Sequence, residues 1–304
     1  MSWRPKWQNF RSRKWEHVRD SWLASVPQFP TIGARPEPGL ELLTPLLEIE
    51  IPENSGRFSD VAGIRTTVLW EAVFLFHKCA HTNLAAQRLV QQGMQSWSLF
   101  NAYHSAYLGA KGIMALLGVA LPNIKGTQIA IDLFPEPVRR PSRRSLGALQ
   151  FEEFLIVRLK PLEQRYLWEA FQRVLRMCDA SCWDMTIRES LLDLAYESIT
   201  PPRNHFLYKA HYWPLNDLLS DTAREISVDL FGTQLDVEEE GFLLRLCFSV
   251  YRLFEQLMRD LAIYSAVIRY QIDSSRFFTG SEIELESYKR FIAQGETRDR
   301  KSVV

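Results

Sequence analysis

The sequence carries no net charge, and this absence removes the simplest argument for a nucleic-acid partner. Its 304 residues contain 36 Lys and Arg and 36 Asp and Glu, so the formal charges cancel. A protein that binds a polyanion through its overall charge is expected to be basic. Any contact with a nucleic acid must therefore come from a local patch of residues.

Cysteines are few, and no apolar run is long. The most apolar stretch, 113–121, is far shorter than the roughly 20 residues that a bilayer-spanning helix needs. The N-terminal residues 1–20 are rich in Trp, Arg and Lys and lack the apolar core of a signal peptide.

The cysteines are too irregularly spaced for a disulfide framework and indicate reduced, buried thiols. They are Cys79, Cys178, Cys182 and Cys247. We therefore expect a soluble, cytoplasmic protein without a membrane contact.

Most of the sequence has the periodicity of amphipathic helices. Apolar residues recur from 61 to 90, after a capping Asp60, and the pattern stops at Gly93. A second helix is expected over 96–117, and the short link makes the two helices antiparallel neighbours. The other expected helices cover 12–25, 161–177, 183–197, the segment after Pro202, 240–272 and 281–293.

Two segments alternate between apolar and polar residues as strands do. They are 127–134 and 151–158, with the basic, proline-rich loop 135–144 between them. We therefore predict a mainly α fold, a helical bundle that carries a small two-stranded β insertion at about 126–158.

The composition divides the chain into three parts. These are a Trp- and Arg-rich N-terminal arm (1–59), a helical domain with the insertion (60–275), and a C-terminal helix with a disordered tail (276–304). The arm is expected to lie over the helical domain with its aromatic residues buried, and stacking on RNA is the alternative. Those residues are Trp3, Trp7, Trp15 and Trp22.

Two segments resemble the HEPN superfamily. The first, 102–118, reads AYHSAYLGAKGIMALLG, in which an aromatic pair precedes small residues, Ala-Lys and a leucine-rich turn. Its small residues would let a neighbouring helix approach closely. They are Ala106, Gly109, Ala110 and Gly112. The second segment, 201–211, reads PPRNHFLYKAH and begins with a proline pair that favours a helix start.

The resemblance implies a HEPN-like helical bundle and a metal-independent endoribonuclease that acts as a homodimer. HEPN ribonucleases carry an Arg and, four to six residues beyond it, a His. Here four residues separate Arg203 from Tyr208, and seven separate it from His211. Arg203 would grip a phosphate, and Asn204 would orient the nucleotide. His205 or His211 would act as general base or acid, and Tyr208 would hydrogen-bond the phosphate.

Weaker patterns indicate further RNA contacts. A cluster of arginines lies in the proline-rich loop, and two polar residues lie on the second predicted helix. A solvated surface is the alternative interpretation for all of them. The residues are Arg139, Arg140, Arg143, Arg144, His104 and Lys111.

Metal and cofactor chemistry is not predicted. His77 and His81 have the i, i+4 spacing of a zinc-binding pair, but apolar neighbours favour a structural role. Cys178 and Cys182 lack the two-residue spacer of a redox motif.

The sequence leaves two hypotheses open. In the first, the protein acts on RNA within a prokaryotic defence or toxin system. In the second, it is a catalytically inactive helical module that binds and regulates a partner protein, with the N-terminal arm and residues 241–272 as contact surfaces.

Overall fold

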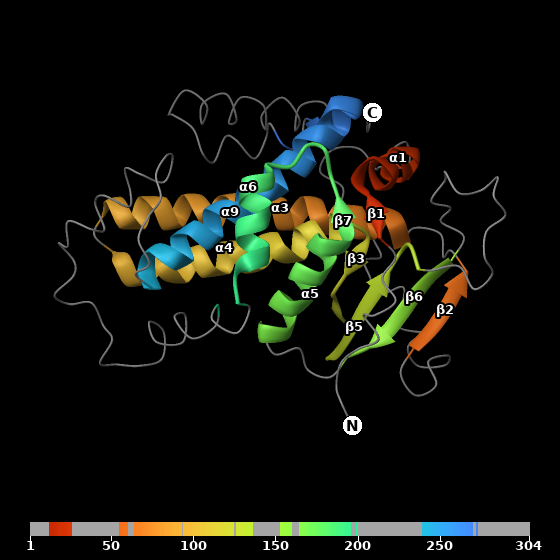
Figure 1. The fold of residues 1–304 in the computed structure, drawn as a ribbon, viewed down its shortest axis with the longest axis horizontal. Coiled ribbons are helices and arrows are strands. Elements are labelled where there is room, and N and C mark those ends of the chain that lie inside the picture. The colour runs from red at the N-terminus through yellow and green to blue at the C-terminus, as the bar shows by residue number, and fades with distance from the viewer. Residues whose placement is uncertain are drawn as a thin grey trace, which may run out of the picture.

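The computed structural model describes most of the helical core of the chain. The described residues are 12–25, 55–59, 64–92, 94–124, 126–135, 153–159, 164–195, 199, 239–269 and 272. They are mainly helical, with a few strands (Figure 1). The helices are α1 (Trp15–Ser25), α3 (Ile64–Gln91), α4 (Gln95–Leu116), α5 (Gln164–Met177), α6 (Met185–Asp193) and α9 (Glu239–Tyr264). None of these helices is long and apolar enough to cross a membrane.

The observed helices follow the predicted ones, with one break. The helix predicted over 240–272 ends at Tyr264, and a separate helical turn covers 266–269. Ser265 begins this turn, because its hydroxyl accepts a hydrogen bond from the Ile268 amide at 3.3 Å. The predicted cap at Asp60 and the predicted helices after Pro202 and over 281–293 lie outside the described residues.

Helices α3 and α4 form the predicted antiparallel hairpin (Figure 1). Two buried serines of α4 fix its register against α3. The Ser98 hydroxyl donates to the Ala86 carbonyl at 2.7 Å, and the Ser105 hydroxyl donates to the Cys79 carbonyl at 2.8 Å. Because the two serines lie two turns apart, they hold the same face of α4 against α3.

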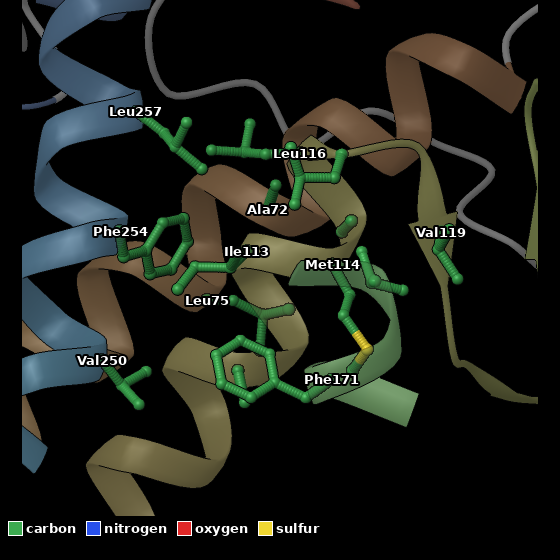
Figure 2. Close-up of a cluster of buried hydrophobic side chains, with 14 of the residues drawn as sticks. Ala72, Leu75, Ile113, Met114, Leu116, Val119, Phe171, Val250, Phe254 and Leu257 are labelled. Carbon is green, nitrogen blue, oxygen red and sulfur yellow. The ribbon is translucent and has the colours of Figure 1, made fainter. Parts of the chain in front are cut away.

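Helix α9 crosses the hairpin at two glycines of α4. A Cβ atom on Gly109 would lie 2.7 Å from Val250 Cγ1, and one on Gly112 would lie 2.2 Å from Phe254 Cζ. Figure 2 shows Val250, Phe254 and Leu257 of α9 beside the hairpin core. The prediction that small residues of this segment admit a neighbouring helix is therefore confirmed at Gly109 and Gly112.

The sheet is larger than the sequence indicated. Its strands run antiparallel in the order β2-β6-β5-β3, and β4 also pairs with β5. They are β2 (Ser55–Ser59), β3 (Val119–Ala120), β4 (Asn123–Ile124), β5 (Thr127–Asp132) and β6 (Glu153–Arg158). Both predicted strands are present and pair with each other, so the prediction of two strands is incomplete. Strands β3 and β4 are too short to show alternation, and β2 lacks β-branched residues.

A buried ion pair joins the N-terminal arm to this sheet. Strand β1 (Arg13–Lys14) pairs in parallel with β7 (Cys178–Asp179). The Arg13 guanidinium lies 3.1 Å from Asp132 Oδ1 at the end of β5, and both side chains are almost wholly buried. It also donates to the Leu117 carbonyl at 2.8 Å, where α4 ends. One side chain thus connects the arm, the hairpin and the sheet.

Helix α1 lies over the helical body, as predicted for the arm. Trp15 and Trp22 are fully buried. The Trp15 indole donates to Asp260 Oδ2 of α9, and the Trp22 indole donates to the Leu116 carbonyl of α4, each at 2.7 Å. These two indoles therefore have no surface for RNA stacking, and Trp3 and Trp7 lie outside the described residues.

Substitution of Gly112 by Ala is expected to lower the free energy of unfolding by about 1–3 kcal/mol, because the new methyl group overlaps the Phe254 ring. Urea denaturation measures this cost. The double variant Gly112→Ala, Phe254→Leu is expected to be less destabilised than the sum of the two single variants, since leucine lacks the overlapping ring atoms. Strict additivity would contradict the proposed close contact.

Breaking the Arg13–Asp132 ion pair is expected to destabilise the fold. Asp132→Asn keeps the side-chain shape but removes the negative charge that lies 3.1 Å from the buried Arg13 guanidinium, and should cost about 3 kcal/mol or more by urea denaturation. The matched control is Glu169→Gln, which breaks the partly exposed Arg173–Glu169 pair at 2.9 Å. The control should cost less than about 0.5 kcal/mol. Equal costs would show that burial does not matter here.

Candidate nucleic-acid interface

The described residues contain only part of the site predicted from the sequence. His104 and Lys111 both lie on α4, and the interface is built outward from them. The predicted catalytic residues lie outside the described residues, as do the arginines of the proline-rich loop. These residues are Arg203, Asn204, His205, Tyr208, His211, Arg139, Arg140, Arg143 and Arg144.

The hairpin has a charge pattern that the net charge conceals. The chain has 36 carboxylates in 304 residues, more than one in ten, yet residues 72–131 contain none. The same stretch holds three of the six histidines and four Lys or Arg residues. These four are Lys78, Arg88, Lys111 and Lys125. The hairpin is therefore locally positive in a protein whose charges cancel overall. Counting charge segment by segment would have revealed this signal.

Three of these cations form no salt bridge within the described part of the chain. Lys78 and Arg88 on α3 are exposed, and Lys111 on α4 is half-buried. None of the three forms a salt bridge with a described residue, whereas arginines of α1, α5 and α9 pair with carboxylates. Those pairs are Arg19–Asp260, Arg173–Glu169, Arg252–Glu255 and Arg259–Glu255. Lys78, Arg88 and Lys111 therefore differ from these arginines, and we treat them as the cations that an anionic ligand would meet.

Glu71 is the single carboxylate within α3 and α4, and it connects two of these cations. Burial raises the pKa of Glu71, while Lys111 and Lys78 act in the opposite direction. Both lysines therefore lie close to one carboxyl group. Its Oε2 atom is buried and makes no hydrogen bond to any described residue. Burial disfavours the charged form of Glu71, whereas the two lysines favour it.

A row of four rings runs along α4, and we term it the α4 ring ladder. Trp97 meets Phe100 edge-on, with ring centroids 6.2 Å apart and planes at 88°. Phe100 and His104 lie 6.0 Å apart at 10°, and His104 and Tyr107 lie 6.5 Å apart at 11°. Trp97 is 55% exposed and His104 is exposed. The spacing of three and four residues aligns the rings on one face, and Lys111 follows one turn later.

The α4 ring ladder lies in a different sector of the helix from the contacts with α3, α5 and α9, although Phe100 and Tyr107 are half-buried and Tyr107 packs against the core. Gly109 faces α9, Ser105 faces α3, and Tyr103 meets Trp168 of α5 with ring centroids 6.2 Å apart. At 100° per residue, these contacts account for the buried faces of α4. Sequence analysis found His104 and Lys111 on this face but missed Trp97 and Phe100.

The histidine and the two cysteines that the sequence offered as weaker metal or redox candidates pack against the protein interior. His77 is half-buried and meets Phe76 edge-on at 6.2 Å. Burial raises the pKa of both Cys178 and Cys182 to about 12, so both thiols stay protonated near neutral pH. Within the described ranges, no three potential metal ligands among His, Cys, Asp and Glu come together.

The α3–α4 hairpin thus combines exposed rings, unpaired cations and a long absence of carboxylates. This combination suits a ligand that is anionic and carries flat rings, as nucleic acids do. No family model, curated protein or solved structure matches the chain.

Proposed function

We propose that this protein binds RNA on the α3–α4 hairpin, as a HEPN-type RNA-acting protein of a prokaryotic defence or toxin system. The observation that carries the proposal is the run 72–131, which has no carboxylate and whose described cations form no salt bridge with a described residue. A phosphate backbone gains affinity from such cations by releasing its bound counterions. The resemblance of segments 102–118 and 201–211 to HEPN proteins supports RNA as the nucleic acid.

In this proposal, cleavage belongs to the Arg203 motif and needs no metal. A general base, His205 or His211, removes the proton of a ribose 2′-hydroxyl, whose oxygen then attacks the adjacent phosphorus. The bond to the 5′-oxygen breaks, a 2′,3′-cyclic phosphate forms, and the leaving oxygen takes a proton from an acidic group. Arg203 stabilises the charge on the phosphate, and Asn204 and Tyr208 position it. Two copies of the chain bring two motifs to one cleft.

A second candidate function is docking onto a partner protein without catalysis. The observation that favours it is the exposure of apolar side chains on the same hairpin. Phe74 is 42% exposed and Met94 is 49% exposed. Patches of this kind often mark protein contacts. The absence of carboxylates next to the exposed rings favours RNA over a protein ligand.

Removal of the two lysines beside Glu71 should weaken RNA binding. For the double variant Lys78→Ala, Lys111→Ala, we expect about tenfold weaker binding of a fluorescein-labelled RNA by anisotropy at low salt. The slope of log affinity against log salt should become shallower by about 2, because two phosphate contacts are lost.

The matched control is Arg173→Ala, Arg252→Ala, which also removes two positive charges but takes them from salt-bridged positions on α5 and α9. It should leave the salt slope nearly unchanged. Equal weakening by both double variants would show that only the total charge matters, and would contradict a site on the hairpin.

Cleavage is tested separately with a single-stranded RNA in EDTA. The parent protein is expected to cut it, and Arg203→Ala and His211→Ala should each lower the rate by about 10²-fold or more. Gel analysis of the products should show 2′,3′-cyclic phosphate ends. Undiminished cleavage by both variants would contradict the assigned motif. RNA binding without any cleavage by the parent would contradict catalysis and favour an inactive HEPN-type protein.

A further inference from the structure

We infer that unpaired nucleobases stack on the α4 ring ladder, with Trp97 as the outermost platform, so that the hairpin binds single-stranded rather than duplex RNA. This inference rests on the proposed function, because it names the form of RNA that the same hairpin takes. It concerns a binding site on α4 that is separate from the predicted catalytic motif at 201–211.

The exposure and orientation of Trp97 make it suitable as a platform. Its side chain is 55% exposed, although an indole gains more free energy than most side chains from burial. The planes of Trp97 and Phe100 are almost perpendicular, at 88°. An edge-on contact leaves at least one indole face uncovered by Phe100. A base can stack on that face, as bases do on aromatic residues of single-strand-binding proteins.

The next three rings are stacked in sequence with nearly parallel planes. Phe100, His104 and Tyr107 are parallel within about 11° at each step. A flat ligand ring that lies parallel to one of these side-chain rings is therefore nearly parallel to the neighbouring ring as well.

The cations lie where a strand that contacts these rings would place its phosphates. Lys111 follows Tyr107 by one turn of α4, and Lys111 and Lys78, on the two helices of the hairpin, both act on the pKa of Glu71. A single strand can present its bases to the rings and its phosphates to the lysines together. A duplex encloses its base faces within its own stack, so it can reach the lysines but gains nothing from the rings.

Three ligands of equal length separate the contribution of bases from that of phosphates. They are a 12-nucleotide single-stranded RNA, the same strand with abasic sites at its central positions, and the corresponding duplex. Trp97→Ala should weaken binding of the intact single strand by about tenfold, as measured by anisotropy. Trp97→Phe should retain most of the affinity, because phenylalanine still offers a ring face.

The matched control is Tyr264→Ala, which removes an aromatic residue of equal exposure, 56%, from the C-terminal end of α9. It should bind all three ligands as the parent does. The abasic strand and the duplex should bind more weakly than the intact strand and should not distinguish Trp97→Ala from the parent. Circular dichroism confirms that each variant is folded, and Trp97→Phe serves as a second test of the ring.

The outcomes separate this inference from the function on which it rests. Equal weakening of all three ligands by Trp97→Ala, or no weakening of any, overturns base stacking while RNA binding by the lysines stands. Tighter binding of the duplex than of the single strand overturns it as well. If the parent protein binds none of the ligands, the proposed function itself is wrong.

Discussion

The close crossing of α4 and α9 at two glycines is the constraint on which the rest of the structure depends. The space that a side chain at Gly112 would fill is occupied by Phe254, whose ring also meets Phe76 of α3 edge-on at 5.1 Å. Three helices therefore share one core, visible in Figure 2. Because the glycines fix which side of α4 enters this core, they also fix which side remains for other contacts. The α4 ring ladder lies on that remaining side.

Ion pairs are unevenly distributed among the helices and strands. Charges that hold the fold together are paired, as Arg13 is with Asp132 and Arg19 with Asp260. The cations of the hairpin contribute nothing of this kind to described residues. Surface cations without a salt bridge cost little free energy when exposed, so stability alone does not explain why sixty successive positions contain no carboxylate. The proposed anionic ligand would account for both features.

Periodicity predicted the helices well because each buried stripe is long and regular. It missed β2, β3 and β4, since short strands depend on tertiary pairing with β5 and β6 rather than on their own pattern. The proposed interface shares two residues with the weaker RNA contacts predicted from the sequence. His104 and Lys111 were identified from their polar character, but the ladder was not, because aromatic residues at helical spacing usually belong to a core. Only the position of α5 explains why Tyr103 is buried while Tyr107 joins the ladder.

In the proposed function, RNA binding and RNA cleavage belong to different parts of the chain, and this separation affects how the departed Arg203 motif should be understood. A tyrosine stands at the position where active HEPN ribonucleases have histidine, and the next histidine lies farther along the chain. If catalysis were lost, selection would no longer maintain the residues of that motif, but it would still maintain the residues of the hairpin that bind RNA in this proposal. The rings and cations of α3 and α4 need no catalytic partner in order to hold RNA. A catalytically silent protein with this hairpin would therefore still be an RNA-binding protein, and regulation of a partner would act through RNA that it holds.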